Sequence, residues 1–265
     1  DGKTQYEFLG VPFAQPPVGL LRFMPPQPVK PWVEVMEAVK DGATCIQAVS
    51  ELSDEFAGET GDNTEESEDC LTLNIFTNSL GRRKAPQAVM VWIHGGGFTL
   101  GSKDIYRMSG LVAQDVVLVA MNYRLGGLGF LSFGNDLVSG NMGLRDQHLA
   151  LMWVQANIHE FGGDPTKITI FGESAGAVSV QAQVLSPLNS GLLHGAIAQS
   201  GSILFLNNDS RGAEKKFAIS LAEALSCPTT LGLDTLVCLQ NTDFDFVNDA
   251  KMITDPMETS YDVSA

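Results

Sequence analysis

Residues 168–185, ITIFGESAGAVSVQAQVL, join a short apolar run to a serine flanked by glycines and then to a stretch rich in alanine and valine. The apolar run 168–171 predicts a buried strand, and a helix must begin near Ser174. Glycine at 172 and 176 relieves the crowding that side chains would cause in so sharp a turn. We therefore predict a strand–turn–helix unit that lifts the Ser174 hydroxyl above a sheet.

A second glycine motif lies upstream. His94-Gly95-Gly96-Gly97-Phe98 directly follows another apolar strand pattern, at 89–93. A run of glycines leaves backbone N–H groups open to a carbonyl oxygen, as an oxyanion hole requires, and the dipole of a helix that begins at Ser174 adds to this effect. Both motifs after strands, in this order, predict a serine nucleophile that attacks an acyl carbonyl.

The rest of the chain alternates apolar runs with helical patterns, which predicts an α/β fold with strands paired in parallel through helical crossovers. Proline-rich residues 1–40 fit extended structure at a sheet edge better than helix. The predicted strands are 71–76, 88–93, 116–122, 168–171 and 196–199, and the predicted helices are 144–155, 177–185 and 213–226.

Composition excludes several classes of function. The chain has 265 residues with 16 Lys and Arg against 31 Asp and Glu, a net charge of −15 that opposes binding to nucleic acid. The nearest basic cluster is the short run Arg82-Arg83-Lys84. Apolar runs have strand length, so no membrane span is expected. The chain opens on Asp1 without a signal peptide, and we expect that its N-terminus was removed or not included.

Four cysteines, Cys45, Cys70, Cys227 and Cys238, permit three pairings. Their spacing favours local pairs, Cys45 with Cys70 and Cys227 with Cys238, which would indicate an oxidising compartment. Four free buried thiols are the alternative. No CxxC or HxxxH spacing occurs, so neither a metal nor a cofactor is expected.

The segment between Cys45 and Cys70 is strongly acidic and contains no Lys, Arg or His. A solvated, self-repelling loop is one interpretation. The other is an electrostatic funnel that favours cationic or neutral ligands. Its nine acids are Glu51, Asp54, Glu55, Glu59, Asp62, Glu65, Glu66, Glu68 and Asp69.

The chain resembles the type-B carboxylesterase/lipase family over nearly its whole length. The matching stretches are GVPFAQPPVGLLRF, SEDCLTLNIF, VMVWIHGGGF, MNYRLGGLGF, GNMGLRDQHLAL, FGGDPTKITIFGESAGAVSV and GAIAQSGS. The resemblance implies an α/β-hydrolase fold with a mostly parallel central sheet flanked by helices. It makes Ser174 the nucleophile, the N–H groups of Gly96, Gly97 and Ala175 the oxyanion donors, and Glu173 a neighbouring carboxylate.

The resemblance also supports both disulfides and implies two structural ion pairs, Arg22 with Glu68 and Arg124 with Asp146. One expectation of the fold is not met. Its triad runs in the order Ser, acid, His, yet His194 is the only histidine after Ser174 and no acid lies between them. We expect His94, His148, His159 and His194 to be structural.

We therefore interpret residues 1–265 as the N-terminal part of a single α/β-hydrolase domain, truncated at its C-terminus and lacking the acid and the histidine. The complete protein is predicted to hydrolyse small-molecule esters through an acyl-enzyme on Ser174. Loss of triad members costs ~10⁴ to 10⁶ in kcat in other serine hydrolases, so the isolated chain is expected to have negligible turnover.

Several alternatives stay open. The family also contains non-catalytic adhesion or ligand-binding members, although retention of Ser174 argues against that function, and a peptidase or lipase would share the serine turn. Cholinesterases resemble the chain but carry a tryptophan in the first disulfide loop, where this chain has only Phe56, so a broad carboxylesterase is favoured. The disulfides and the sequon Asn208-Asp209-Ser210 suggest secretion. The oligomeric state is not predicted.

Overall fold

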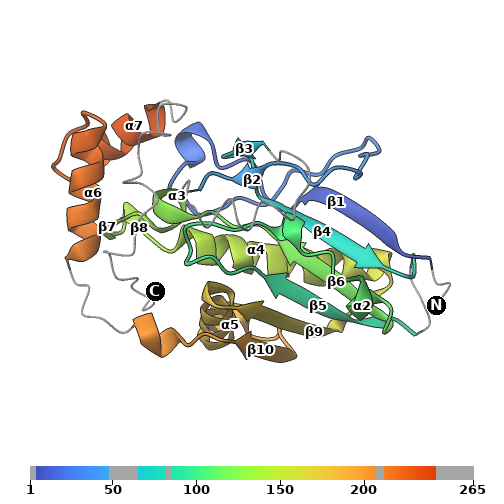
Figure 1. Ribbon diagram of the computed structural model, residues 1–265. Helices are drawn as coiled ribbons and strands as arrows, with labels where there is room; N and C mark the ends of the chain where they lie inside the picture. Colours follow the sequence, from blue (N-terminus) through green and yellow to red (C-terminus); the bar gives the residue numbers. More distant parts are fainter. Residues whose placement is uncertain (1–3, 48–64, 82–84, 207–211, 243–265) are drawn as a thin grey trace.

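A computed structural model describes residues 4–47, 65–81, 85–206 and 212–242 (Figure 1). Its centre is a six-stranded sheet in which the order of strands is β1-β4-β6-β5-β9-β10. These strands are β1 (Tyr6–Pro12), β4 (Thr72–Thr77), β5 (Gln87–Ile93), β6 (Val116–Met121), β9 (Gly163–Glu173) and β10 (Gly195–Gln199).

Strand directions differ from the sequence expectation at one place. β6, β5, β9 and β10 are parallel, whereas β4 pairs antiparallel with both β1 and β6. The mostly parallel sheet that the resemblance implies is therefore confirmed, and β4 is the exception to the parallel pairing that the alternation of strands and helices predicted. All six residues of β4 are buried because the strand lies inside the sheet with both faces covered, and burial on two faces does not require parallel neighbours.

The principal helices are α4 (Met142–Asn157), α5 (Ala175–Leu185), α6 (Ala213–Ala224) and α7 (Leu233–Asn241), with short helices α2 (Ser109–Val112) and α3 (Gly126–Phe130). α4 and α5 pack against the sheet, whereas α6 and α7 pack in a separate cluster with Phe133 and Val138 at one end of the molecule (Figure 1). Apolar residues of α4 and α5 pack in one cluster with the alternate β5 residues Val89, Val91 and Ile93. Trp92 belongs to a different cluster, which includes Val112 of α2, because successive residues of a strand point to opposite faces of the sheet.

The observed bounds of the strands and helices agree with most of the predicted ones. β9 extends the predicted 168–171 strand at both ends, and α5 begins at Ala175, as the turn at Ser174 requires. β1 forms one edge of the sheet, in agreement with extended structure in the proline-rich segment. The sequence did not predict α7, the pair β2 (Thr44–Cys45) and β3 (Glu66–Ser67), or the pair β7 (Ser132–Asn135) and β8 (Val138–Ser139).

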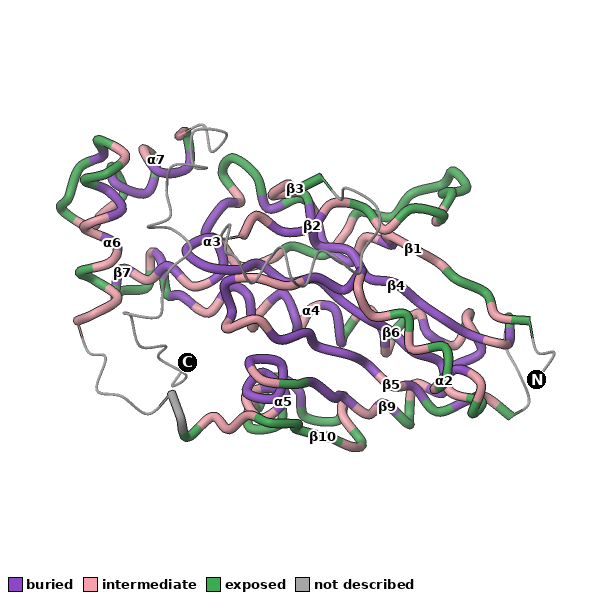
Figure 2. The backbone as a smooth tube through the Cα atoms, viewed as in Figure 1, coloured by how far each residue is buried: buried purple, intermediate pink, exposed green. Residues whose placement is uncertain are grey.

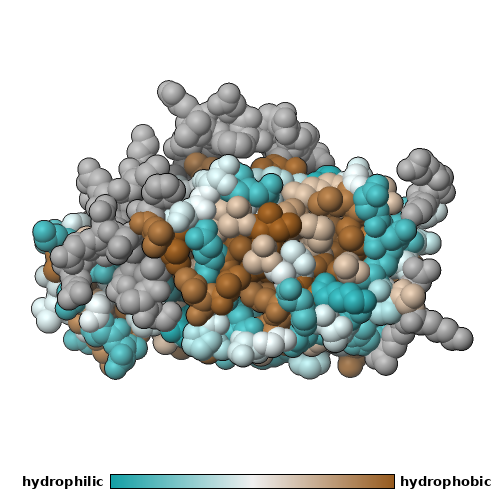
Figure 3. Space-filling model, turned by 90° about the horizontal axis from the view of Figure 1, so that it is seen from below, coloured by the Kyte–Doolittle hydropathy of each residue, from teal (hydrophilic) through white to brown (hydrophobic). Residues whose placement is uncertain are grey.

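The two sides of the sheet end differently. At the β1 edge, Leu9 of β1 forms a parallel bridge with Val39 on the outer side of the strand, and the Leu9 N–H donates to the carbonyl of Ala38 at 2.9 Å. β10 pairs only with β9 among the described strands, and most of its residues are exposed (Figure 2). Figure 3 shows apolar surface on this side, to which the exposed residues Val184, Leu185, Leu188, Ile197 and Leu204 belong.

Both disulfides have the local pairing that the spacing predicted, Cys45 with Cys70 and Cys227 with Cys238. Both ion pairs implied by the resemblance are also present. Arg22 contacts Glu68 with Nη2 to Oε1 at 2.5 Å, and Arg124 contacts Asp146 with Nη2 to Oδ1 at 2.7 Å.

The Arg22 side chain also stabilises the end of α7. Its Nη1 donates to the carbonyl oxygens of Leu239, Gln240 and Thr242 at 3.0, 3.3 and 2.7 Å. A cation at the C-terminus of a helix satisfies carbonyls that have no partner within the helix and is favoured by the helix dipole. The pair Arg22–Glu68 thereby links α7 to the segment beside Cys70.

Some expectations fall outside the described residues: Phe56, the acids at 51, 54, 55, 59 and 62, the basic run 82–84, and the sequon at 208–210. Within the described part of the chain, helices long and apolar enough to cross a bilayer are absent.

Candidate active site

Ser174 lies at the junction of β9 and α5 in a strained backbone conformation. Its φ is 54° and its ψ is −120°, a combination that L-residues rarely adopt and that persists only when the surrounding structure enforces it. Its N–H donates to the carbonyl of Gln199 at the end of β10, at 2.9 Å. The residue is half-buried rather than enclosed in the core, so the sharp strand-to-helix turn predicted from the sequence is present.

The two glycines that flank the serine are required by close packing. A Cβ at Gly172 would lie 2.6 Å from the carbonyl oxygen of Ile93, and a Cβ at Gly176 would overlap that same oxygen. Real Cβ atoms essentially never approach backbone so closely. The G-x-S-x-G spacing therefore lets the first turn of α5 rest directly on the end of β5.

The triple-glycine segment, which we call the glycine loop (residues 94–101), leaves the end of β5 beside Ser174. A Cβ at Gly95 would lie 2.8 Å from the carbonyl oxygen of Glu173 and 3.3 Å from the Cβ of Ser174. Gly96 and Gly97 follow with φ of 101° and 60°, and both are half-buried. The structure thus brings the two sequence motifs into contact, with Gly95 as the residue nearest to Ser174.

His94 fixes the start of the glycine loop. Its ring stacks on Tyr123 with 4.3 Å between centroids, its Nδ1 lies 2.9 Å from the carbonyl oxygen of Gly95, and the Tyr123 hydroxyl donates to the His94 carbonyl at 2.9 Å. Burial lowers the pKa of His94 to about 4, the bond to Gly95 opposes that shift, and the nearby charge of Lys103 adds to it. His94 is therefore neutral at pH 7 and serves as a rigid wall of the loop.

The middle of the loop is held in two further ways. The carbonyl of Gly96 accepts hydrogen bonds from the N–H groups of Thr99 and Leu100, both at 3.0 Å, and the carbonyl of Phe98 accepts from Gly126 N–H at 2.8 Å. The Phe98 ring also contacts Phe130, with 5.1 Å between centroids. Backbone donors in this loop are accordingly preorganised, as stabilisation of an oxyanion demands.

Glu173, the last residue of β9, is exposed and directs its carboxylate toward the glycine loop. Its Oε2 would lie 3.2 Å from a Cβ at Gly95. The Tyr106 pKa is raised, first by burial and second by the negative charge of Glu173. Glu173 thus places negative charge beside the serine turn.

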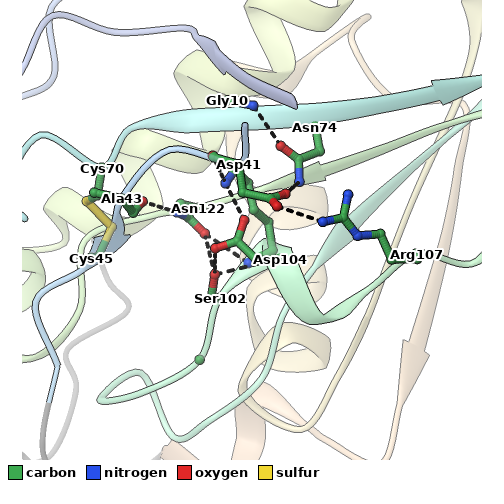
Figure 4. A network of polar contacts seen from close by, with 12 residues as sticks. Gly10, Asp41, Ala43, Cys45, Cys70, Asn74, Ser102, Asp104, Arg107 and Asn122 are labelled. Carbon is green, nitrogen blue, oxygen red and sulfur yellow. Dashed lines mark hydrogen bonds and ion pairs between the residues drawn. A yellow bond between two sulfur atoms is a disulfide. The ribbon is translucent and has the colours of Figure 1, made fainter. Parts of the chain in front are cut away.

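A buried polar network holds the segment that follows the glycine loop, and the sequence analysis did not identify it (Figure 4). The fully buried Lys103 donates from Nζ to Asp104 Oδ1 at 2.5 Å and to the Asp41 carbonyl at 2.6 Å. Asn122 accepts from Lys103 N–H at 2.9 Å and donates to the Ala43 carbonyl at 3.2 Å. The adjacent Lys103 and Asp104, just after the glycine loop, were the only signal of this network in the sequence.

The four histidines have structural partners, as the sequence analysis expected. Besides His94, His148 contacts Asn189 Oδ1 at 2.7 Å, and His159 contacts Glu160 at 3.0 Å. Ile168 N–H lies 3.3 Å from His194 Nδ1. These contacts provide no general base for Ser174.

A strained serine between a parallel strand and a helix, beside a glycine loop from the neighbouring parallel strand, defines an α/β-hydrolase fold. The model of the carboxylesterase family matches residues 1–263, so the chain belongs to that family.

Curated relatives agree with this membership. A carboxylic ester hydrolase from Bombus ignitus is 44% identical over 239 residues, which cover 90% of this chain and 42% of the relative. The liver carboxylesterase of Sus scrofa is 46% identical over 88% of this chain and 42% of its own length. The cocaine esterase of Homo sapiens is 47% identical over 74% of the chain and 36% of its own length. The chain therefore spans well under half the length of these relatives.

Proposed function

We propose that this chain carries the nucleophile and the oxyanion hole of a serine carboxylic ester hydrolase of broad specificity. One observation supports the proposal above all others. Ser174 has the strained φ of 54° at the strand-to-helix turn, and the adjacent glycine loop is so close that a Cβ added at Gly95 would lie 3.3 Å from the Ser174 Cβ.

The reaction follows from this geometry. The Ser174 Oγ attacks the carbonyl carbon of the ester while a general base takes the hydroxyl proton. The resulting oxyanion accepts hydrogen bonds from N–H groups of Gly96, Gly97 and Ala175, and Ala175 contributes the positive end of the α5 dipole. Collapse of the tetrahedral intermediate expels the alcohol, which receives the proton from the base. Water then attacks the acyl-enzyme in the same manner and releases the carboxylic acid.

The general base and its acidic partner are proposed to come from a part of the protein outside this chain. The four histidines of the chain are engaged elsewhere, and the relatives extend well beyond the matched region. In this interpretation residues 1–265 form the N-terminal part of a single α/β-hydrolase domain. Glu173 would supply negative charge that stabilises a protonated histidine beside the serine.

The substrates are proposed to be small-molecule carboxylic esters, with no preference for choline esters. Curated relatives are described as a liver carboxylesterase, a cocaine esterase and a pyrethroid hydrolase, which act on different molecules. A tryptophan that could hold a quaternary ammonium group is missing from residues 46–69 of the sequence. Of the three tryptophans, Trp92 packs against Tyr106 and Phe171 in the core, and Trp153 packs near Phe161.

We also propose a secreted or secretory-pathway location, which the two disulfides support. Two disulfides close between the four cysteines, and such bonds form and persist in oxidising compartments.

The test of the nucleophile uses the complete protein that contains this chain, treated with a fluorophosphonate probe. We expect covalent labelling at Ser174 and its loss in Ser174→Ala. Ser200→Ala is a matched control, because Ser200 also follows a parallel strand with a φ of 54° but does not lie in a G-x-S-x-G turn. Absence of labelling at Ser174 in the native protein would favour the non-catalytic adhesion or binding function instead.

A second measurement tests the substrate class. We expect the complete protein to hydrolyse a neutral thioester with a kcat/KM at least equal to that for acetylthiocholine, at low and at high salt. A marked preference for acetylthiocholine at both salt concentrations would replace the broad carboxylesterase with a cholinesterase. A preference that disappears at high salt would point to screened charge, as on the acidic segment.

A further inference from the structure

Gln47 makes two hydrogen bonds to one residue of the glycine loop. The Gly101 N–H donates to Gln47 Oε1 at 2.8 Å, and Gln47 Nε2 donates to the Gly101 carbonyl at 3.3 Å. The side-chain amide therefore pairs with both backbone groups of Gly101, as a neighbouring strand would. These residues are 54 positions apart in sequence, so the contact is a long-range one that joins the segment after Cys45 to the glycine loop.

The Gln47 side chain is itself anchored to the disulfide. Its Nε2 also donates to the carbonyl of Cys45 at 3.1 Å, and Cys45 is bonded to Cys70. The backbone of Gln47 forms a hydrogen bond with the carboxylate of Glu66, which is the first residue of β3. Gln47 thus stands at the base of the disulfide-closed acidic segment and cannot shift independently of it.

At the other end, Gly101 lies against the residues nearest to Ser174. A Cβ at Gly101 would be 2.6 Å from His94 Nδ1 and 2.7 Å from the carbonyl oxygen of Gly95, and its φ of 112° favours glycine. Gly95 in turn touches the serine turn. A change in the position of Gly101 is therefore transmitted by direct contact to the part of the loop beside Ser174.

We propose that Gln47 is a positioning residue for the glycine loop, which couples the disulfide Cys45–Cys70 to the oxyanion hole. This inference rests on the proposed function. Gln47 does not contact the reacting atoms. It holds the end of the loop opposite to β5, so that the N–H groups between the two ends keep the orientation that the transition state requires.

The chemistry predicts a specific kinetic signature. Loss of a whole oxyanion donor costs about 10² to 10³ in kcat in a serine protease, so partial misalignment of the donors should cost about tenfold. The interaction develops in the transition state, so kcat should fall while KM changes little. A residue that served only general folding would lower the amount of active enzyme without altering its affinity for a transition-state analogue.

The experiment compares Gln47→Met with the native complete protein. Methionine has a similar length but makes neither hydrogen bond to Gly101. kcat and KM are measured with p-nitrophenyl acetate, the active-site concentration is taken from fluorophosphonate titration, and the inhibition constant of an alkyl trifluoromethyl ketone reports oxyanion stabilisation. Gln155→Met is the matched control. Gln155 lies on α4, and its Nε2 also donates to a glycine carbonyl, that of Gly191, at 3.2 Å.

We expect Gln47→Met to lower kcat per titrated site about tenfold, to leave KM within about twofold, and to weaken the ketone in proportion. Gln155→Met should match the native protein. Unchanged kcat, a change confined to KM, an undiminished ketone affinity, or an equal loss in Gln155→Met would each overturn the inference. If the native protein is labelled at Ser174 and turns over ester, such a result rejects the role of Gln47 alone. A native protein that is not labelled rejects the proposed function as well.

A second comparison tests the coupling to the disulfide. In Cys45→Ala/Cys70→Ala we expect a similar loss of kcat per titrated site, and little further loss when Gln47→Met is added, because both changes release the same contact. Independent, multiplicative losses would show that the disulfide does not act through Gln47. If the cysteine variant does not fold, the single Gln47→Met comparison decides.

Discussion

A methyl group at Gly176 would overlap the carbonyl oxygen of Ile93, so the first turn of α5 is fitted against the last residue of β5. Ile93 directly precedes the glycine loop, and Gly176 lies two residues after Ser174. This one contact sets the separation between the nucleophile and the loop. The two sequence motifs are therefore parts of a single packed unit.

Gly176→Ala should destabilise the protein by about 1 to 3 kcal/mol, because the added methyl group displaces backbone in a tightly packed region. Chemical denaturation followed by circular dichroism measures this change. Gly110→Ala is the control, since a Cβ there meets nothing within 4 Å and Gly110 lies in the short helix α2. Equal midpoints for Gly176→Ala and the native protein would contradict the fit between α5 and β5.

Lys103→Met should destabilise the protein by about 3 to 5 kcal/mol, because it leaves Asp104 as a buried charge without its partner. Burial lowers the pKa of Lys103, and the charge and hydrogen bond of Asp104 oppose that shift. The change is read from the denaturation midpoint. Adding Asp104→Leu to Lys103→Met should recover part of the loss, and additive losses would argue against a coupled pair.

The control for that cycle is an ion pair of the same type whose lysine is exposed. Lys167 lies 2.9 Å from Asp164, and its side chain is 61% exposed. Lys167→Met should change stability by less than about 1 kcal/mol, as surface ion pairs do. A cost comparable to that of Lys103→Met would show that burial is not the deciding factor.

His94 should make stability depend on pH. Its folded pKa of about 4 lies below the ordinary histidine value of 6.5, so between these values the unfolded chain binds more protons than the native protein. Stability therefore rises with pH through this window and is lost as pH falls from about 6.5 toward 4, by about 2 kcal/mol between pH 7 and pH 5. Denaturation midpoints across that range measure the loss.

Carboxylates also titrate near this window, so the contribution of His94 is isolated by comparison. His94→Gln should show a shallower decline in stability between pH 7 and pH 5 than the native protein. His148→Gln is the matched variant, because His148 is only partly buried beside Asn189. Parallel pH profiles for the native protein and His94→Gln would disprove the assignment.

Cys227→Ala/Cys238→Ala should lower stability by about 3 kcal/mol, the chain-entropy estimate for a loop of this length. The two cysteines are 11 residues apart and join the end of α6 to α7, in a core cluster that also contains Leu221 and Leu236. The denaturation midpoint and the loss of helical signal report the change. An unaltered midpoint would mean that packing alone holds α7 in place.

Much of the fold could be predicted because local patterns and tertiary packing agree. Strands β5, β6 and β10 and helix α5 follow directly from apolar runs and the glycine turn. The direction of β4 could not be predicted, since complete burial has the same sequence pattern in either orientation. Helix α7 depends on the disulfide at Cys238 and on Arg22 at its C-terminus, both of which are long-range contacts.

The candidate site shows the same division. Ser174 and the glycine loop were recognisable, because their backbone demands particular residues at fixed spacing. The supports of the loop were not: Gln47 and the Lys103 network draw on partners far along the chain, and neither residue belongs to a motif. The roles of Gly96, Gly97, Ala175 and Glu173 stay predictions until the labelling and kinetic experiments are done.

The two edge strands of the sheet, β1 and β10, differ in whether a further strand could pair with them. Leu9 at β1 already bonds to the segment around Val39, whereas β10 offers its outer backbone groups within the described part of the chain. Any additional strand would therefore join on the side of β10, next to the Gln199 carbonyl that binds Ser174 N–H. A strand paired with β10 would then also hold Gln199 in place, and with it the hydrogen bond to the Ser174 N–H.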